Sequence, residues 1–168
     1  MQSLYSWLVF VHVLAAFGFV LSHAASALAA FRVRAERDPG RIAAMLDLSN
    51  ASMGLMYVCV ALLTAAGVGA GLLGHWFGRL WIWAAIGVLV VVAVAMFAYA
   101  TPYYIRVRLA VGQPGRRTHR RSPSGSRPEP VPPVELAALL ESRRPEGIST
   151  IGGVGLAVLI WLMIFKPF

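Results

Sequence analysis

Residues 80–105, LWIWAAIGVLVVVAVAMFAYATPYYI, contain no Asp, Glu, Lys or Arg. A helix needs about 20 predominantly apolar residues to cross the hydrocarbon core of a bilayer. Uncharged runs also occur at residues 1–31, 48–78 and 147–165, and each is long enough for a crossing or nearly so. The sequence therefore predicts four transmembrane helices, at about residues 5–31, 49–73, 80–104 and 148–165.

The fold class follows from these four segments. We expect an all-α polytopic membrane protein, a single membrane domain over residues 1–168 that folds as an antiparallel bundle of four transmembrane helices. The composition excludes a soluble domain, because 58% of the residues are hydrophobic and 13% are charged, against about 25% charged in soluble proteins. The net charge of +8 is confined to segments between the apolar runs, so we expect the lipid bilayer, and no nucleic acid, as a partner.

A signal peptide is the alternative for the first run, since Ala27-Leu28-Ala29 resembles a cleavage site. The start carries no basic residue and its apolar stretch exceeds the about 7–15 residues of a signal sequence, so we expect it to be retained. The single cysteine, Cys59, excludes an intramolecular disulfide.

Basic residues indicate the orientation. Loops at about residues 32–48 and 105–147 hold 13 of the 15 basic residues, and the positive-inside rule places both loops in the cytoplasm. Both termini then lie outside the cytoplasm. The abundance of Arg beside a single Lys suggests a GC-rich bacterial source, so we expect a multi-pass protein of the bacterial inner membrane. The five tryptophans all fall at the predicted outer ends of the helices, as expected of an interfacial aromatic belt.

The long cytoplasmic loop divides into two parts. Residues 112–133 are rich in Pro, Gly, Ser and Arg, which predicts disorder. Residues 134–144 have the apolar spacing of a short amphipathic helix, which we expect to lie on the membrane surface. The cluster from Arg116 to Arg121 either binds anionic lipid or only enforces the topology. His119 lies within it and receives no role.

Small residues predict where the helices approach closely. Such positions are Gly18, Ser22, Ser26 and Ala30 in the first helix, Gly67 and Gly71 in the second, and Gly152, Gly153 and Gly155 in the fourth. In lipid, helices associate through close backbone contact at such positions. They form either the internal contacts of the bundle or contacts between copies, so we keep open a homo-oligomer or a subunit of a membrane complex.

Two intramembrane histidines, His12 and His23, are the candidate cofactor-binding residues. Ionisable groups inside a span are costly and are functional candidates. Eleven residues return a helix to within about 20° of its starting direction, so both imidazoles share one face, with Phe19 between them. They lie about 16 Å apart along the axis, and therefore belong to two sites.

Depth matching suggests a soft metal site near the cytoplasmic side. His23, Met56, Cys59 and Met96 all lie about 9–14 Å from that edge. Imidazole, thioether and thiol ligands suit Cu(I). The alternative is that Met and Cys fill the core while His23 hydrogen-bonds a hydroxyl or a carbonyl.

His12 has different neighbours at its depth. The same counting places it opposite Ala66, Gly67, Gly87 and Ala157, which leaves space for a haem with His12 as axial ligand. Small residues also line helix contacts that hold no cofactor. The expected cofactor is therefore none, with haem or copper as alternatives.

We predict no catalytic residue. No carboxylate lies inside a predicted span, and no phosphate-binding loop, HExxH or CxxC motif occurs. Ser22 and His23 are adjacent and point about 100° apart, which excludes a nucleophile-base pair.

Three features carry a family resemblance. They are the run His12-Val13-Leu14-Ala15-Ala16, the stretch at residues 61–67 (ALLTAAG), and Pro102 followed by Arg106 and Arg108. Over residues 7–108 the chain resembles uncharacterised small bacterial four-helix integral membrane proteins, and distantly resembles copper-resistance D-type membrane proteins. The resemblance implies a shared four-helix organisation, with His12 as the matching position.

Together these observations favour an inner-membrane protein of structural or accessory type. The alternative is a haem- or copper-binding protein, in electron transfer or copper handling, that uses His12 and His23.

The predicted topology has a direct test. Cysteines introduced at Gly125 and at Gly78 should react with impermeant reagents from opposite faces of the membrane, because an odd number of spans separates them. Labelling of both from one side would contradict the four-span topology.

Overall fold

The computed structural model describes residues 2–113 and 129–168. Its described part consists of helices and their connections, without strands. The elements are α1 (Gln2–Ala35), α2 (Pro39–Leu73), the short 3₁₀ helix η1 (Trp76–Gly78), α3 (Leu80–Ala110), α4 (Pro133–Leu140) and α5 (Arg144–Phe165). Four stretches are long and apolar enough to cross a membrane, namely α1, α2, α3 and the region from Pro133 to Phe165.

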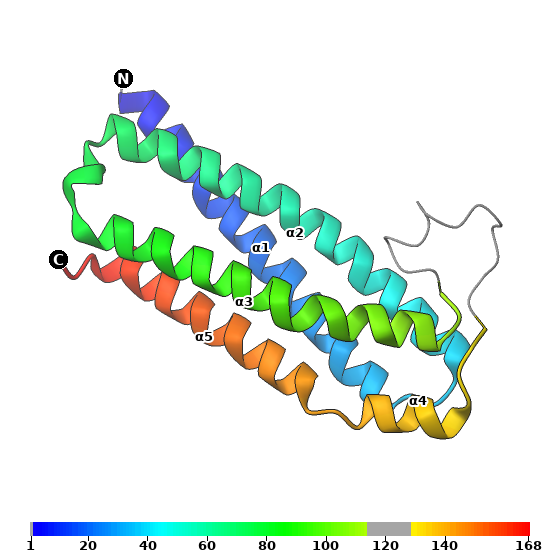
Figure 1. Cartoon of the computed structure of the whole chain (residues 1–168). Helices are drawn as coiled ribbons and strands as arrows, with labels where there is room; N and C mark the ends of the chain where they lie inside the picture. The colour runs from blue at the N-terminus through cyan, green and yellow to red at the C-terminus, as the bar shows by residue number, and fades with distance from the viewer. Residues whose placement is uncertain (1, 114–128) are drawn as a thin grey trace, which may run out of the picture.

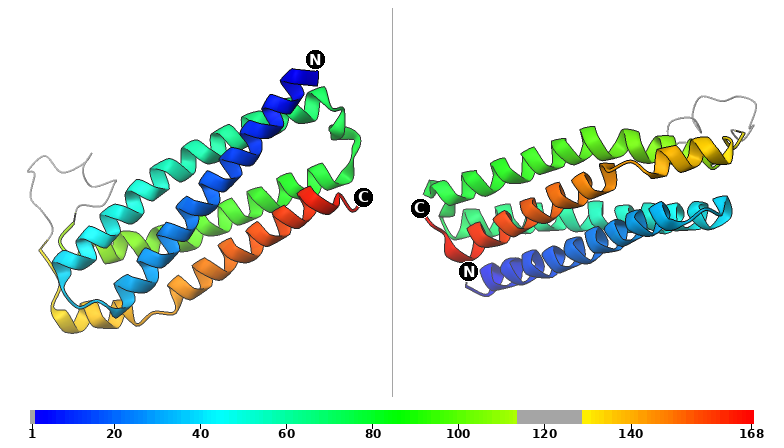
Figure 2. Two further views of the ribbon diagram at one scale, coloured as in Figure 1. Left: turned by 180° about the vertical axis from the view of Figure 1, so that it is seen from behind. Right: turned by 90° about the horizontal axis from the view of Figure 1, so that it is seen from below.

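The long helices form two pairs. α1 packs along α2, and α3 packs along α5, as the view from below shows (Figure 2). Both chain termini and η1 lie at one end, which we call the terminal end, and α4 lies at the other, which we call the loop end (Figure 1). α1 runs obliquely, starting beside α2 and reaching the other pair towards the loop end (Figure 1).

The helices extend beyond the predicted spans. α1, α2 and α3 have 34, 35 and 31 residues, or about 51, 52 and 46 Å at 1.5 Å per residue. The hydrocarbon core of a bilayer is about 30 Å thick. The extra turns contain charged residues that separate the uncharged runs, such as Arg32 and Arg34 in α1. Arg is a good helix former, so the helices can continue beyond the apolar segments.

The buried core is concentrated at the loop end. This loop-end core comprises Val33, Ile42, Leu46, Tyr103, Val107, Ala110, Val111, Leu136, Leu140 and Ile148. α1, α2, α3, α4 and α5 each contribute at least one of these side chains. The two helix pairs are therefore joined mainly where they extend towards the loop end.

The position of α4 corrects the sequence prediction. The predicted surface helix at residues 134–144 is shorter in the structure, and Leu136 and Leu140 are buried in the loop-end core rather than turned towards a membrane surface. Pro133 sets the start, and the chain turns before α5 begins at Arg144. An amphipathic helix buries its apolar face equally well against the ends of other helices.

The predicted disordered segment at residues 112–133 falls mostly outside the described residues, as do His119 and the cluster from Arg116 to Arg121. Its two described ends are hydrogen-bonded. The Val131 amide donates to the Ala110 carbonyl, and the Gln113 side-chain amide donates to the Ala43 carbonyl and the Asp47 carboxylate.

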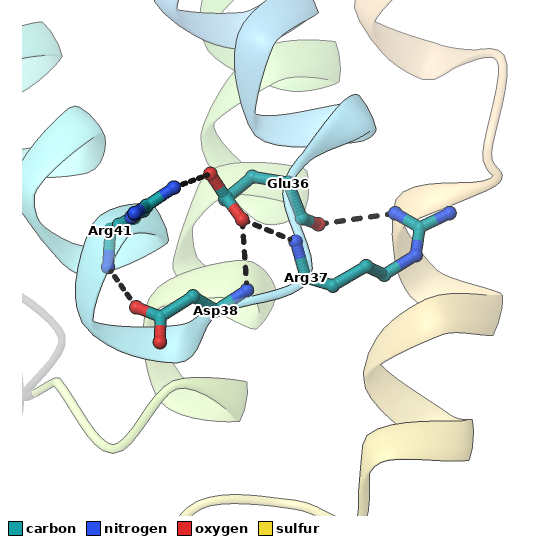
Figure 3. Close-up of polar contacts among 4 residues, drawn as sticks. All are labelled: Glu36, Arg37, Asp38 and Arg41. Carbon is teal, nitrogen blue, oxygen red and sulfur yellow. Dashed lines mark hydrogen bonds and ion pairs between the residues drawn. The ribbon is translucent and has the colours of Figure 1, made fainter.

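A compact polar turn joins α1 to α2 (Figure 3). Glu36 accepts hydrogen bonds from the backbone amides of Asp38 and Arg37, at 3.0 and 2.8 Å. These bonds favour the ionised carboxylate and, with the charge of Arg41, hold the pKa of Glu36 below its usual value. Asp38 caps α2 by accepting from the Arg41 amide at 2.7 Å. The turn is therefore fixed by its own side chains.

Leu140 tests the role of α4. Its side chain is 1% exposed, so Leu140→Ala should lower the free energy of unfolding by about 2–5 kcal/mol. Val134 on the same helix is 82% exposed, and Val134→Ala serves as the matched control. Thermal unfolding in mild detergent measures both, and equal effects would show that α4 does not pack as described.

Candidate functional site

His12 is held by a hydrogen bond to the neighbouring helix. Its Nδ1 lies 2.8 Å from the backbone carbonyl oxygen of Leu63 in α2. A carbonyl can only accept, so Nδ1 carries the proton and donates it. In the neutral imidazole, Nε2 therefore keeps its lone pair. The bond fixes both the tautomer and the direction of the ring.

Gly67 makes this approach possible. A Cβ atom at Gly67 would lie 2.8 Å from His12 Nδ1 and 2.9 Å from Cε1, closer than real Cβ contacts. Residue 67 follows Leu63 by one helical turn, so the missing side chain opens the path to the Leu63 carbonyl. This confirms the predicted juxtaposition of His12 with Gly67. At Gly87, which was also expected opposite His12, an added Cβ would have no atom within 4 Å, so that part of the prediction is wrong.

His23 faces a different helix. Its ring stacks on Phe19, with centroids 6.2 Å apart and an interplanar angle of 11°. Its other neighbour is Gly152 of α5, where an added Cβ would overlap Nε2 and Cε1 of the imidazole. Because α1 is oblique, one face of it meets α2 near His12 and α5 near His23. The two histidines thus lie in separate contacts, as their spacing predicted.

The four predicted soft metal ligands lie on α1, α2 and α3. Cys59 is buried in the contact between α1 and α2, where a Cβ at Gly18 would lie 2.7 Å from its Sγ. Met96 packs against the loop-end core. His23 contacts α5, and Met56 is half-buried on α2. Within residues 2–113 and 129–168, no three His, Cys, Asp or Glu side chains are grouped to hold a metal ion.

Small residues line the helix contacts as predicted. Ser22 is buried and donates to the Gly18 carbonyl, and the Ser49 hydroxyl donates to that of Ser26 at 3.4 Å. Gly155 faces Val92 of α3 and Gly71 faces Phe77 of η1. Gly153, by contrast, has open space where a Cβ would lie.

Ion pairs at the loop end were not predicted from the sequence. Arg34 of α1 pairs with Glu146 of α5, and Arg108 of α3 pairs with Asp47 of α2 at 2.9 Å. Each joins one helix pair to the other. The two residues of each pair lie far apart in the sequence, so no helical periodicity indicates that they meet. Both acidic partners flank an uncharged run, Asp47 before residues 48–78 and Glu146 before residues 147–165.

An aromatic cluster at the terminal end was also not predicted. It consists of Tyr5, Trp76 and Trp81, with Lys166 against it. The Trp76 indole donates to the Tyr5 hydroxyl at 3.3 Å, and the Trp76 and Trp81 ring centroids are 6.1 Å apart. The Lys166 ammonium lies 4.9 Å from the Trp76 centroid, within the range of a cation–π interaction. The tryptophan belt was the only sequence signal for it.

Comparison with known proteins gives no further assignment. No family model, no curated protein and no solved structure matches this chain. The resemblance to copper-resistance D-type proteins thus stays a prediction.

Adjacent glycines test the His23 contact. Gly152→Ala should displace the His23 ring and lower the free energy of unfolding by about 1–3 kcal/mol, as overpacking does. Gly153→Ala adds the same methyl group into open space, so it should be neutral or stabilising by up to about 1 kcal/mol. Detergent-based unfolding titrations measure both. A neutral Gly152→Ala would show that His23 does not pack against α5.

Proposed function

We propose that this chain is a multi-pass protein of the bacterial inner membrane that acts as a structural or accessory component. In this proposal its helices form an antiparallel bundle, with both termini outside the cytoplasm. Large apolar side chains are exposed along all four long helices, including Phe17, Leu62, Phe97 and Ile164. Exposed apolar surface of this extent marks contact with a membrane or with another protein, and its presence along four helices of membrane-spanning length favours lipid. The basic loops support the orientation.

The observation that carries the accessory role is the hydrogen bond between His12 and the Leu63 carbonyl. It gives the imidazole a structural task, because a polar side chain in hydrocarbon is stabilised by a bond across helices. His23 is likewise used in packing, between Phe19 and Gly152. Both histidines therefore have a role that requires no bound cofactor.

The same bond also favours a second candidate, a haem- or copper-binding protein. A histidine that ligates a metal commonly donates its other ring N–H to a backbone carbonyl. His12 has this arrangement, with Nε2 left as the potential ligand atom. Gly67 is the small neighbour that the structure places beside it, and the imidazole fills the space that a side chain would take there.

Absorption spectroscopy and elemental analysis separate the two candidates. The test uses protein expressed with haem precursor and copper and purified in mild detergent. On the accessory proposal, the preparation should show no Soret band and no stoichiometric copper. His12→Ala should lower the free energy of unfolding by about 0.5–2 kcal/mol through loss of the interhelical bond.

The control is His75→Asn, because His75 is exposed and has a positive φ of 56°, which Asn tolerates. A Soret band that is lost in His12→Ala and kept in His75→Asn would overturn the accessory proposal and support haem. Copper that is lost in His23→Ala would support the copper alternative.

A further inference from the structure

A pocket opens at the terminal end between the start of α1 and the end of α2. Gln2, Tyr5, Ser6, Leu73, Gly74 and Trp76 line it, and its volume is about 540 Å³. Its lining combines apolar surface with an amide and two hydroxyl groups. In a membrane protein, aromatic side chains with a polar group mark the level of the lipid headgroups. The pocket thus combines apolar and polar walls at that level.

The hydrogen bonds in this pocket leave a donor available. The Trp76 indole can only donate, so the Tyr5 oxygen is the acceptor of their bond, and the phenolic proton is not used in it. Ser6 donates to the Gln2 carbonyl at 3.1 Å and keeps its lone pairs. A ligand in the pocket can therefore accept a hydrogen bond from Tyr5.

A cation, Lys166, packs against Trp76, one of the residues that line the pocket. Lys166 follows α5 in a left-handed conformation, with φ of 46°. This places its ammonium 4.9 Å from the Trp76 ring centroid and 5.7 Å from that of Trp81. Trp76 therefore both lines the pocket and contacts Lys166. Because Lys166 already occupies an aromatic face, a cationic ligand such as a choline group would have to displace it.

The charged side chains at the terminal end favour an anionic ligand. All seven acidic residues lie at the loop end, in or next to the helix ends that meet there. They are Glu36, Asp38, Asp47, Glu129, Glu135, Glu141 and Glu146. The terminal end carries Arg79 and Lys166. The chain thus supplies no carboxylate side chain to balance these two cations, and anionic groups outside the protein are attracted there.

From these observations we infer that the terminal-end pocket binds the phosphate headgroup of an anionic phospholipid. The Tyr5 hydroxyl donates to a phosphate oxygen, Lys166 supplies the opposite charge, and the apolar wall at Leu73 contacts the glycerol and first acyl carbons. This inference rests on the membrane placement in the proposed function. It is independent of whether His12 binds a cofactor.

Lipid-resolved native mass spectrometry of the detergent-purified, delipidated protein tests the inference. The probes are phosphatidylglycerol and phosphatidylcholine, each added at matched concentrations. Phosphatidylglycerol should bind more tightly. Tyr5→Phe and Lys166→Gln should each weaken its binding by about fivefold, whereas Lys166→Arg should retain it. Circular dichroism confirms that the variants stay folded, and Tyr5→Phe preserves the ring.

The matched control is Arg41→Gln at the start of α2, which removes a cation at the loop end whose side chain is 75% exposed and should leave phosphatidylglycerol binding unchanged. Unchanged phosphatidylglycerol binding in the Tyr5→Phe, Lys166→Gln double variant would overturn the inference. So would tighter binding of phosphatidylcholine, or displacement of the lipid by excess inorganic phosphate, which would indicate a soluble anion. Failure of membrane insertion would instead appear in the cysteine-labelling experiment, so the two proposals fail separately.

Discussion

The outward-facing apolar surface of the four long helices is the constraint on which the rest of the structure depends. Side chains as large as Trp7, Phe17 and Phe97 are more than 60% exposed. In lipid, burying such side chains against another helix lowers the free energy little, because the surrounding hydrocarbon is equally apolar. Along the apolar stretches, the helices are therefore held by close backbone approach and by polar contacts. The structure shows such contacts there, and at the loop end it adds a core of buried hydrophobic side chains.

Glycine determines where such contacts form. The rings of His12 and His23 and the thiol of Cys59 each occupy the space that a side chain would fill at Gly67, Gly152 and Gly18. Each larger group thereby comes against the backbone of a neighbouring helix. In the case of His12 the approach ends in a hydrogen bond to a carbonyl. One pattern, a larger side chain against a glycine, explains both the packing and the placement of the candidate site.

The helices and part of the candidate site could be predicted from sequence. Runs without charge located the long helices, and counting depth placed His12 opposite Gly67. The partner of His23 could not be predicted, because it depends on the oblique path of α1, and helix crossing is set by the whole contact rather than by spacing. The location of α4 was also missed. Leu136 and Leu140 form the same amphipathic pattern whether they meet lipid or protein.

The two ends of the bundle are stabilised in different ways. The loop end has its own core and ion pairs, with Arg34 and Arg108 each matched by a carboxylate. The two helix pairs are therefore joined mainly at this end, by buried apolar side chains and by these ion pairs. The terminal end has aromatic rings and the cation Lys166 instead, and the chain provides no carboxylate side chain there.

This asymmetry has a consequence for the histidines. His23 lies nearer the loop end, where its ring packs between Phe19 and Gly152. His12 lies towards the terminal end, in the contact between α1 and α2, where its ring packs against Gly67 and is hydrogen-bonded to the Leu63 carbonyl. The Leu63 carbonyl also serves the helix ladder of α2, so loss of the imidazole does not leave it unsatisfied. The two rings are thus held differently: a hydrogen bond to the neighbouring helix sets the tautomer and direction of His12, whereas stacking on Phe19 and contact with Gly152 position His23.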